Sequence, residues 1–111
     1  MNQEEVIYTG QKERTPEGGM VVFRNGIPFS PRPSQKLINH SPDGFNWSYW
    51  GSGPAQLALA LLLDVTHNPS LAIAKHQQYK FEVVGKLQDS WEIMSVEILA
   101  WLKTREVSNV N

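Results

Sequence analysis

The most apolar stretch of the chain lies at residues 55–63, where every residue except Gln56 is alanine or leucine. These residues are among the strongest helix formers, and a helix that is apolar on all sides is buried on all sides. Pro54 suits the first helical position, so we expect Gly53 to cap the helix and Gln56 to reach back to that cap. The run is about half of the roughly 20 residues that cross a bilayer. The pattern therefore predicts a central core helix and no membrane span.

Short runs of β-branched and aromatic residues alternate with turn residues in the first 30 positions. Residues 6–9 and 20–23 are predicted strands, joined by a loose polar loop. Asn25-Gly26 is a strong signal for a two-residue hairpin turn, which returns the chain into residues 27–29. Pro28 cannot donate to a strand ladder, so the third strand should be short or at an edge. So small a sheet is marginally stable alone, and we expect one face to be covered.

A second helix is predicted over residues 69–87. Asn68 and Pro69 repeat the pattern of a cap followed by proline, and apolar residues then recur at helical spacing. His76 lies on or beside this apolar stripe, so we expect it to be packed and hydrogen-bonded.

A third helix is predicted to begin at Ser95, which we expect to act as its cap. Its apolar side includes Val96, Leu99 and Leu102. The preceding run at 91–93 fits either a short strand or an apolar turn. The predicted fold class is therefore α+β, with a small N-terminal antiparallel sheet of hairpins packed on about three helices around the buried Ala/Leu helix.

The connection at residues 30–53 has no clear period. Three prolines interrupt it, and residues 34–39 fit a turn or two of helix or a short strand. Four aromatic residues then fall within six positions: Phe45, Trp47, Tyr49 and Trp50. They either form a lid on the central helix, or some of them line a ligand pocket or stack on a base. Long ordered connections are frequently functional.

Composition limits the organisation of the chain. Its 111 residues, 41% of them hydrophobic, are enough for one compact domain, which we expect over residues 6–104. The polar ends predict a disordered segment at 1–5 and a frayed tail at 105–111. No cysteine is present, which excludes disulfides, thiolate metal sites and cysteine nucleophiles. We find no basic stretch followed by an apolar signal-peptide region, and expect a cytoplasmic protein.

The net charge of −1 hides an uneven distribution, because no acidic residue occurs between Glu17 and Asp43. Basic residues in that interval either attract phosphate or nucleic acid, or are simply a solvated surface. The start of the central helix adds unsatisfied N–H groups and two glycines that permit close approach, unless Ser52 and the chain's own carbonyls satisfy those groups. The candidate ligand-binding residues are Arg32, Lys36, His40, Trp47, Tyr49, Ser52, Gly53 and Gln56.

Known catalytic motifs are absent from the sequence. The glycines at 51–53 lack the residues of a Walker loop, a dinucleotide site or a nucleophile elbow. The three histidines lack zinc-site spacing. We therefore predict no catalytic residue, metal or cofactor, and keep as the alternative a small hydrolase or transferase that uses loop residues such as His40 and Asp43.

Several motifs taken together resemble a family of small bacterial and phage proteins classed only as a domain of unknown function. The likeness extends from about Tyr8 to Leu102 and includes Gly-Ser-Gly-Pro-Ala-Gln-Leu-Ala-Leu-Ala-Leu-Leu at 51–62, with further matches at 16–19, 31–34, 39–42, 44–45, 47, 79–81 and 101–102. The resemblance implies a bacterial or viral context and one compact domain, but no mechanism.

Two functional classes follow from the sequence. The first is a small non-catalytic binding or regulatory module that recognises an anionic ligand, nucleic acid or protein partner through residues 30–53 and the start of the central helix. The second is the hydrolase or transferase. Convergence of His40 with a carboxylate beside an open pocket would favour the enzyme, and an exposed aromatic and basic surface would favour the binding module.

Overall fold

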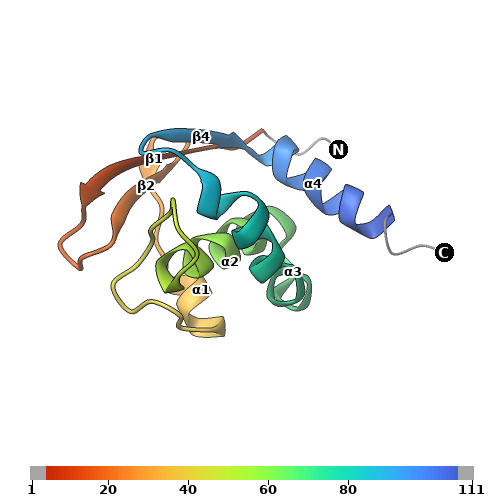
Figure 1. Cartoon of the computed structure of the whole chain (residues 1–111), viewed down its shortest axis with the longest axis horizontal. Helices are drawn as coiled ribbons and strands as arrows, with labels where there is room; N and C mark the ends of the chain where they lie inside the picture. The colour runs from red at the N-terminus through yellow and green to blue at the C-terminus, as the bar shows by residue number, and fades with distance from the viewer. Residues whose placement is uncertain (1–4, 108–111) are drawn as a thin grey trace.

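Four strands form one antiparallel sheet in the order β3-β2-β1-β4 in the computed structural model, which describes residues 5–107 (Figure 1). The strands are β1 (Ile7–Arg14), β2 (Met20–Arg24), β3 (Ile27–Pro28) and β4 (Trp91–Met94). Strand β4 pairs with β1 from Ile7 opposite Met94 to Gly10 opposite Trp91. The run at 91–93 is therefore a strand, and β1 occupies an interior position that the hairpin signals alone did not predict.

The hairpin between β2 and β3 has the predicted two-residue turn. Asn25 and Gly26 both have positive φ, at 51° and 82°. Both φ values match the type I′ turn expected from an Asn-Gly pair. Strand β3 has only two residues and lies at the sheet edge, as Pro28 predicted.

Helices cover the sheet and surround one central helix, α2. Their bounds are α1 (Arg32–Leu37), α2 (Ser52–Thr66), α3 (Pro69–Glu82) and α4 (Ser95–Val107), with a short 3₁₀ turn, η1, at Val84–Lys86. Figure 1 shows α1, α2 and α3 together on one side of the sheet, while α4 continues from the end of β4. Leu57, Leu59, Leu61 and Leu62 of α2 have no exposed surface. The predictions of a buried Ala/Leu helix and of the α+β class are confirmed.

The start of α2 differs from the prediction. Gly51, and not Gly53, is the N-cap, so the helix begins at Ser52 and Pro54 lies inside its first turn. A proline is tolerated there because the first turn has no partner for its missing N–H. Gln56 does not reach back to the cap, since its amide is used elsewhere in the core.

Two other helix boundaries also differ. Helix α3 begins at the predicted Asn68 cap, whose side chain accepts a hydrogen bond from Leu71 N, but it ends at Glu82 and not at residue 87. Gly85 follows within η1, and glycine disfavours helix continuation. The Ser95 hydroxyl is not a helix cap, because it accepts a hydrogen bond of 2.9 Å from Val6 N and so ties α4 to the start of β1.

The C-terminal helix runs to Val107, three residues past the predicted end of the compact domain. Arg105 pairs with Glu82 of α3 and lies 4.9 Å from the centre of the Trp101 ring, which holds this last turn against the domain. Residues 108–111 of the predicted tail and residues 1–4 of the predicted N-terminal end lie outside the described residues. Within the described chain, no helix combines the length and apolarity needed to span a membrane.

Candidate functional site

Gln56 is an interior residue that fastens the 30–42 segment to α2. Its side chain has no exposed surface and makes three hydrogen bonds. The amide oxygen accepts from Ser41 N at 2.9 Å, and the amide nitrogen donates to Ser34 Oγ at 2.9 Å and to Ile38 O at 3.1 Å. The part of the connection that contains α1 therefore folds against the first turns of α2. Gln56 itself is closed to a ligand in this structure.

Trp47 is also enclosed. The ring has no exposed surface, packs edge-on against Trp91 at 5.4 Å and donates from Nε1 to the Asp89 carbonyl. Phe45 is 3% exposed, and both rings belong to the same buried cluster as the leucines of α2. This agrees with the interpretation of these two residues as part of a lid on the central helix.

His40 meets a second histidine and not a carboxylate. Its Nε2 lies 2.9 Å from Nε2 of His76, whose Nδ1 lies 2.8 Å from the Ile73 carbonyl. Because that carbonyl only accepts, His76 donates from Nδ1, and His40 donates to the remaining nitrogen. Burial, followed by the nearby His76 and Lys80, lowers the pKa of His40. His76 is 3% exposed, which confirms the expectation of a packed, hydrogen-bonded histidine.

Asp43, the proposed partner of His40 in the enzyme hypothesis, lies beside Gly18 of the β1–β2 loop. It lines an open groove of about 730 Å³ together with Arg32, Glu13 and Glu17. Arg32 comes from the part of the sequence that has no acidic residue, but in the fold it shares this groove with three of them. Their negative charge weakens the attraction of Arg32 for an anion. Lys36, in the last turn of α1, is exposed.

Two exposed aromatic rings rest on glycine backbone beside the start of α2. A Cβ atom on Gly51 would lie 2.5 Å from the Tyr49 ring, and a Cβ on Gly85 would lie 2.3 Å from the Trp50 ring. Side chains at these glycines would displace the rings. Trp50 Nε1 also donates to the Phe81 carbonyl at 3.2 Å, with the two ring centres 6.4 Å apart.

We define the aromatic surface as Tyr49, Trp50 and Phe81, which are 47%, 56% and 52% exposed. Lys86 is exposed next to Gly85, whereas Lys80, whose Nζ lies 4.5 Å from the centre of the Phe81 ring, is 9% exposed. Neither lysine forms an ion pair with a described residue. The result is an aromatic and cationic surface at the junction of the 30–53 connection and α2.

The N-terminus of α2 itself is partly covered. Gly53 is buried, and a Cβ there would lie 2.6 Å from Asn46 Cβ, while Ser52 remains exposed. Pro54 contributes no N–H. Of the eight predicted residues, the structure places Tyr49, Ser52 and Gly53 together, and turns Trp47 and Gln56 into the core.

A polar cluster that the sequence did not reveal lies at the other end of α2. Asp64 Oδ2 accepts hydrogen bonds from the Tyr8 hydroxyl and from Arg24 Nε, the latter at 2.8 Å. Burial and then the hydrogen bond to Asp64 raise the pKa of Tyr8 well above its ordinary value, so the phenol stays a neutral donor. The hydrogen bond to Asp64 raises the pKa of Arg24. These residues come from β1, β2 and α2, so no local motif marks them.

Metal binding receives no support from the described part of the chain, where no group of three or more histidine, cysteine, aspartate or glutamate side chains is placed to hold an ion.

The fold and surface define a small α+β domain with an exposed aromatic and basic surface. The chain belongs to the family of unknown function DUF6166, whose family model matches residues 8–104. This confirms the resemblance to a domain of unknown function. No curated protein matches the chain significantly. Nor does any solved structure.

Proposed function

We propose that the protein is a small non-catalytic binding module that holds single-stranded nucleic acid on the aromatic surface. The observation that carries this proposal is the seating of Tyr49 and Trp50 on Gly51 and Gly85, which fixes two large rings while about half of each remains exposed. Rings fixed in this way lose little freedom when a partner stacks on them.

Stacking of bases on such rings has the required energy. Base–aromatic stacking contributes about 1–3 kcal/mol per base and tolerates any sequence, because every base has a π-face. The ring planes of Trp50 and Phe81 are tilted by 37° to each other. This arrangement suits two successive bases, one stacked on each ring, better than a single base lying flat on both.

Lys86 supplies the exposed charge, and Lys80, which is only 9% exposed, lies against the Phe81 ring. Lys86 follows Gly85, on which Trp50 rests, and neither lysine is neutralised by an ion pair among the described residues. Lysine contacts to phosphates position the strand without reading its sequence.

The alternative of a hydrolase or transferase has less support, because His40 is hydrogen-bonded to His76 and Asp43 lies in the separate groove. We further propose a cytoplasmic setting in a bacterium or in phage-infected cells, on the grounds of the cysteine-free sequence and the family resemblance.

Fluorescence anisotropy of a labelled oligothymidylate tests the proposal. We expect saturable binding at low salt, and Trp50→Ala and Phe81→Ala should each weaken it about 5- to 150-fold, which corresponds to one lost stacking contact. Val96→Ala is the matched control, since Val96 is 53% exposed but lies on α4. Absence of binding, or equal binding by all four proteins, contradicts the proposal and favours a protein partner.

Salt dependence tests the charges separately. Lys86→Gln should reduce the slope of log K against log salt by about 0.7, the value for one phosphate contact on a single strand. Arg32→Ala combined with Lys36→Ala tests the candidate residues of α1 in the same way. A flattened slope in that double variant extends the phosphate path to α1, and an unchanged slope limits it to the aromatic surface.

A further inference from the structure

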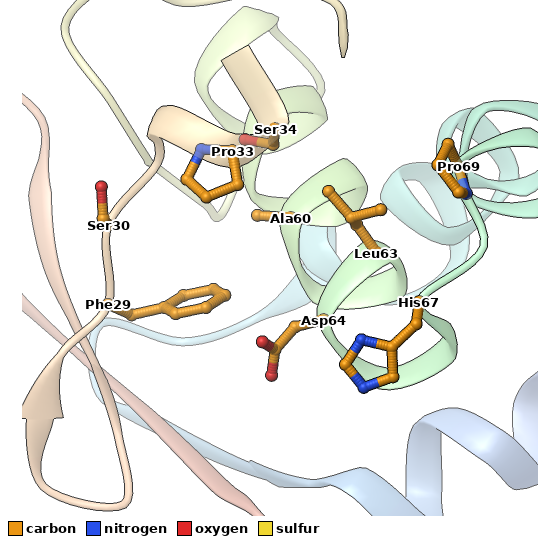
Figure 2. A pocket seen from close by; sticks show the side chains of 9 residues that line it. All are labelled: Phe29, Ser30, Pro33, Ser34, Ala60, Leu63, Asp64, His67 and Pro69. Carbon is orange, nitrogen blue, oxygen red and sulfur yellow. The ribbon is translucent and has the colours of Figure 1, made fainter. Parts of the chain in front are cut away.

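A cavity of about 310 Å³ lies between the segment that follows β3 and the second half of α2 (Figure 2). Its walls are apolar, formed by Phe29, Pro33, Ala60 and Leu63, and Asp64 and His67 lie at one end. Pockets that bind small molecules are typically about 300–1,000 Å³, mainly apolar, with a few convergent polar groups. This cavity has all three properties.

Tyr8 contacts both Asp64, at the polar end of the cavity, and Phe29, in its apolar wall. Its buried ring packs against Phe29 with the ring centres 5.6 Å apart, and its hydroxyl donates to Asp64. Phe29 is held from the other side by Phe45, which stacks on it at 5.7 Å. The cavity is therefore built by fixed side chains before any ligand arrives.

Asp64 determines the chemistry of a ligand. Tyr8 and Arg24 both bond its Oδ2, while Oδ1 has no hydrogen bond from the described residues. An ionised carboxylate only accepts hydrogen bonds, so a ligand atom at Oδ1 has to be a donor. Arg24 already balances the charge of Asp64, so the donor can be neutral.

The position of Asp64 is unfavourable for α2 itself. It lies in the last turn of the helix, where the dipole disfavours a negative charge. His67 follows as the left-handed C-cap with φ of 53°, and Figure 2 shows its ring at the same end of the cavity as the Asp64 carboxylate.

We propose that this cavity binds a small molecule with an apolar body of at least one aromatic ring and a hydroxyl, amide or amine group that donates to Asp64 Oδ1. The site is independent of the proposed function, because it lies at the C-terminal end of α2 and the aromatic surface adjoins the N-terminal end.

A series of one-ring probes tests this chemistry by ¹⁵N–¹H NMR titration of the whole chain. Benzyl alcohol, benzylamine and benzoate share the ring and differ in the group that would meet Asp64. We expect the alcohol and the amine to shift the amide signals of Asp64 and His67 saturably, and benzoate to bind at least about tenfold more weakly, since it has no proton to donate at neutral pH.

Two variants locate the site. Ser30 is exposed and lines the cavity, so Ser30→Trp should fill it and abolish the shifts caused by benzyl alcohol. Tyr8→Phe keeps the ring against Phe29 and removes only the hydroxyl, so benzyl alcohol should bind several-fold more weakly while the spectrum stays folded. Three outcomes overturn the proposal: no saturable shift with the alcohol, equal binding of benzoate, or unchanged binding in Ser30→Trp. The Tyr8, Arg24 and Asp64 cluster would then serve only to join the sheet to α2.

Discussion

Replacing Gln56 with leucine tests how the 30–42 segment is held to α2. Leucine keeps roughly the volume of glutamine but cannot hydrogen-bond. In the structure the glutamine amide is fully buried and bonds Ser34, Ile38 and Ser41. Ser34 Oγ keeps a second partner, because it also donates to the Pro31 carbonyl at 2.7 Å. The substitution therefore removes the hydrogen-bond partner of two backbone groups, the Ser41 N–H and the Ile38 carbonyl.

The expected loss of stability follows from those two groups. A polar group left without a partner costs about 1–3 kcal/mol when it is fully buried and less when it is half-buried, as Ser41 and Ile38 are, and burial of the apolar leucine side chain returns part of the summed cost. We expect the free energy of unfolding to fall by about 1–4 kcal/mol, with the 30–42 segment loosened more than the rest of the domain.

Urea unfolding and amide hydrogen exchange measure the two effects. In Gln56→Leu, exchange at Ser41 should speed up more than exchange in the middle of α2. Leu61→Ala is the control, since it removes a buried side chain of the same helix but none of the Gln56 hydrogen bonds, and should cost about 2–5 kcal/mol with uniformly faster exchange. If Ser41 exchanges in Gln56→Leu at the wild-type rate, or if both variants lose protection in the same pattern, Gln56 does not hold the segment.

Two further predictions concern the hairpin and the histidine pair. Gly26 has φ of 82° and open space around a Cβ, so Gly26→Val should cost about 1–3 kcal/mol through backbone strain alone, and Gly26→Asn less; equal urea midpoints for both variants would contradict this. The pKa of His40 is lowered by burial, His76 and Lys80, so the unfolded chain takes up a proton more readily. Stability should be complete above the ordinary pKa of 6.5 and fall as the pH decreases below it. His40→Gln should flatten that decline in urea unfolding, and an unchanged slope would contradict it.

Elements with strong local signals were predictable from the sequence. The Ala/Leu run fixes α2 because no side of it can face water, and Asn25-Gly26 fixes its turn because few residues adopt two successive positive φ values. Asn68 followed by proline likewise marks the start of α3. In each case the cause lies within a few neighbouring residues.

Elements that depend on distant contacts were not predictable. Strand β4 pairs with β1 across more than 80 residues, and the Ser95 hydroxyl is used by Val6 at a similar separation instead of by its own helix. Gly85, on which Trp50 rests, lies in η1 just after the end of α3, and no local pattern contains that contact.

The candidate site shows the same division. The sequence identified the 30–53 connection as the aromatic segment, but could not separate the exposed Tyr49 from the buried Trp47, because alternation alone does not say which rings the domain covers. It also could not place Glu13 and Glu17 beside Arg32, since the groove joins parts of the chain far apart in sequence.

The composition of α2 directs attention to its two ends. The middle of the helix is apolar and buried, so α2 has few polar side chains. Two of them make structural hydrogen bonds: Gln56 to the 30–42 segment, and Thr66 to the Leu62 carbonyl of its own helix. Ser52 is exposed beside the aromatic surface. Asp64 differs, because it sits at the helix end that disfavours its charge, accepts a hydrogen bond from a buried phenol, and lines the cavity. Because the two proposed sites lie at opposite ends of this helix, we expect them to respond independently to substitution.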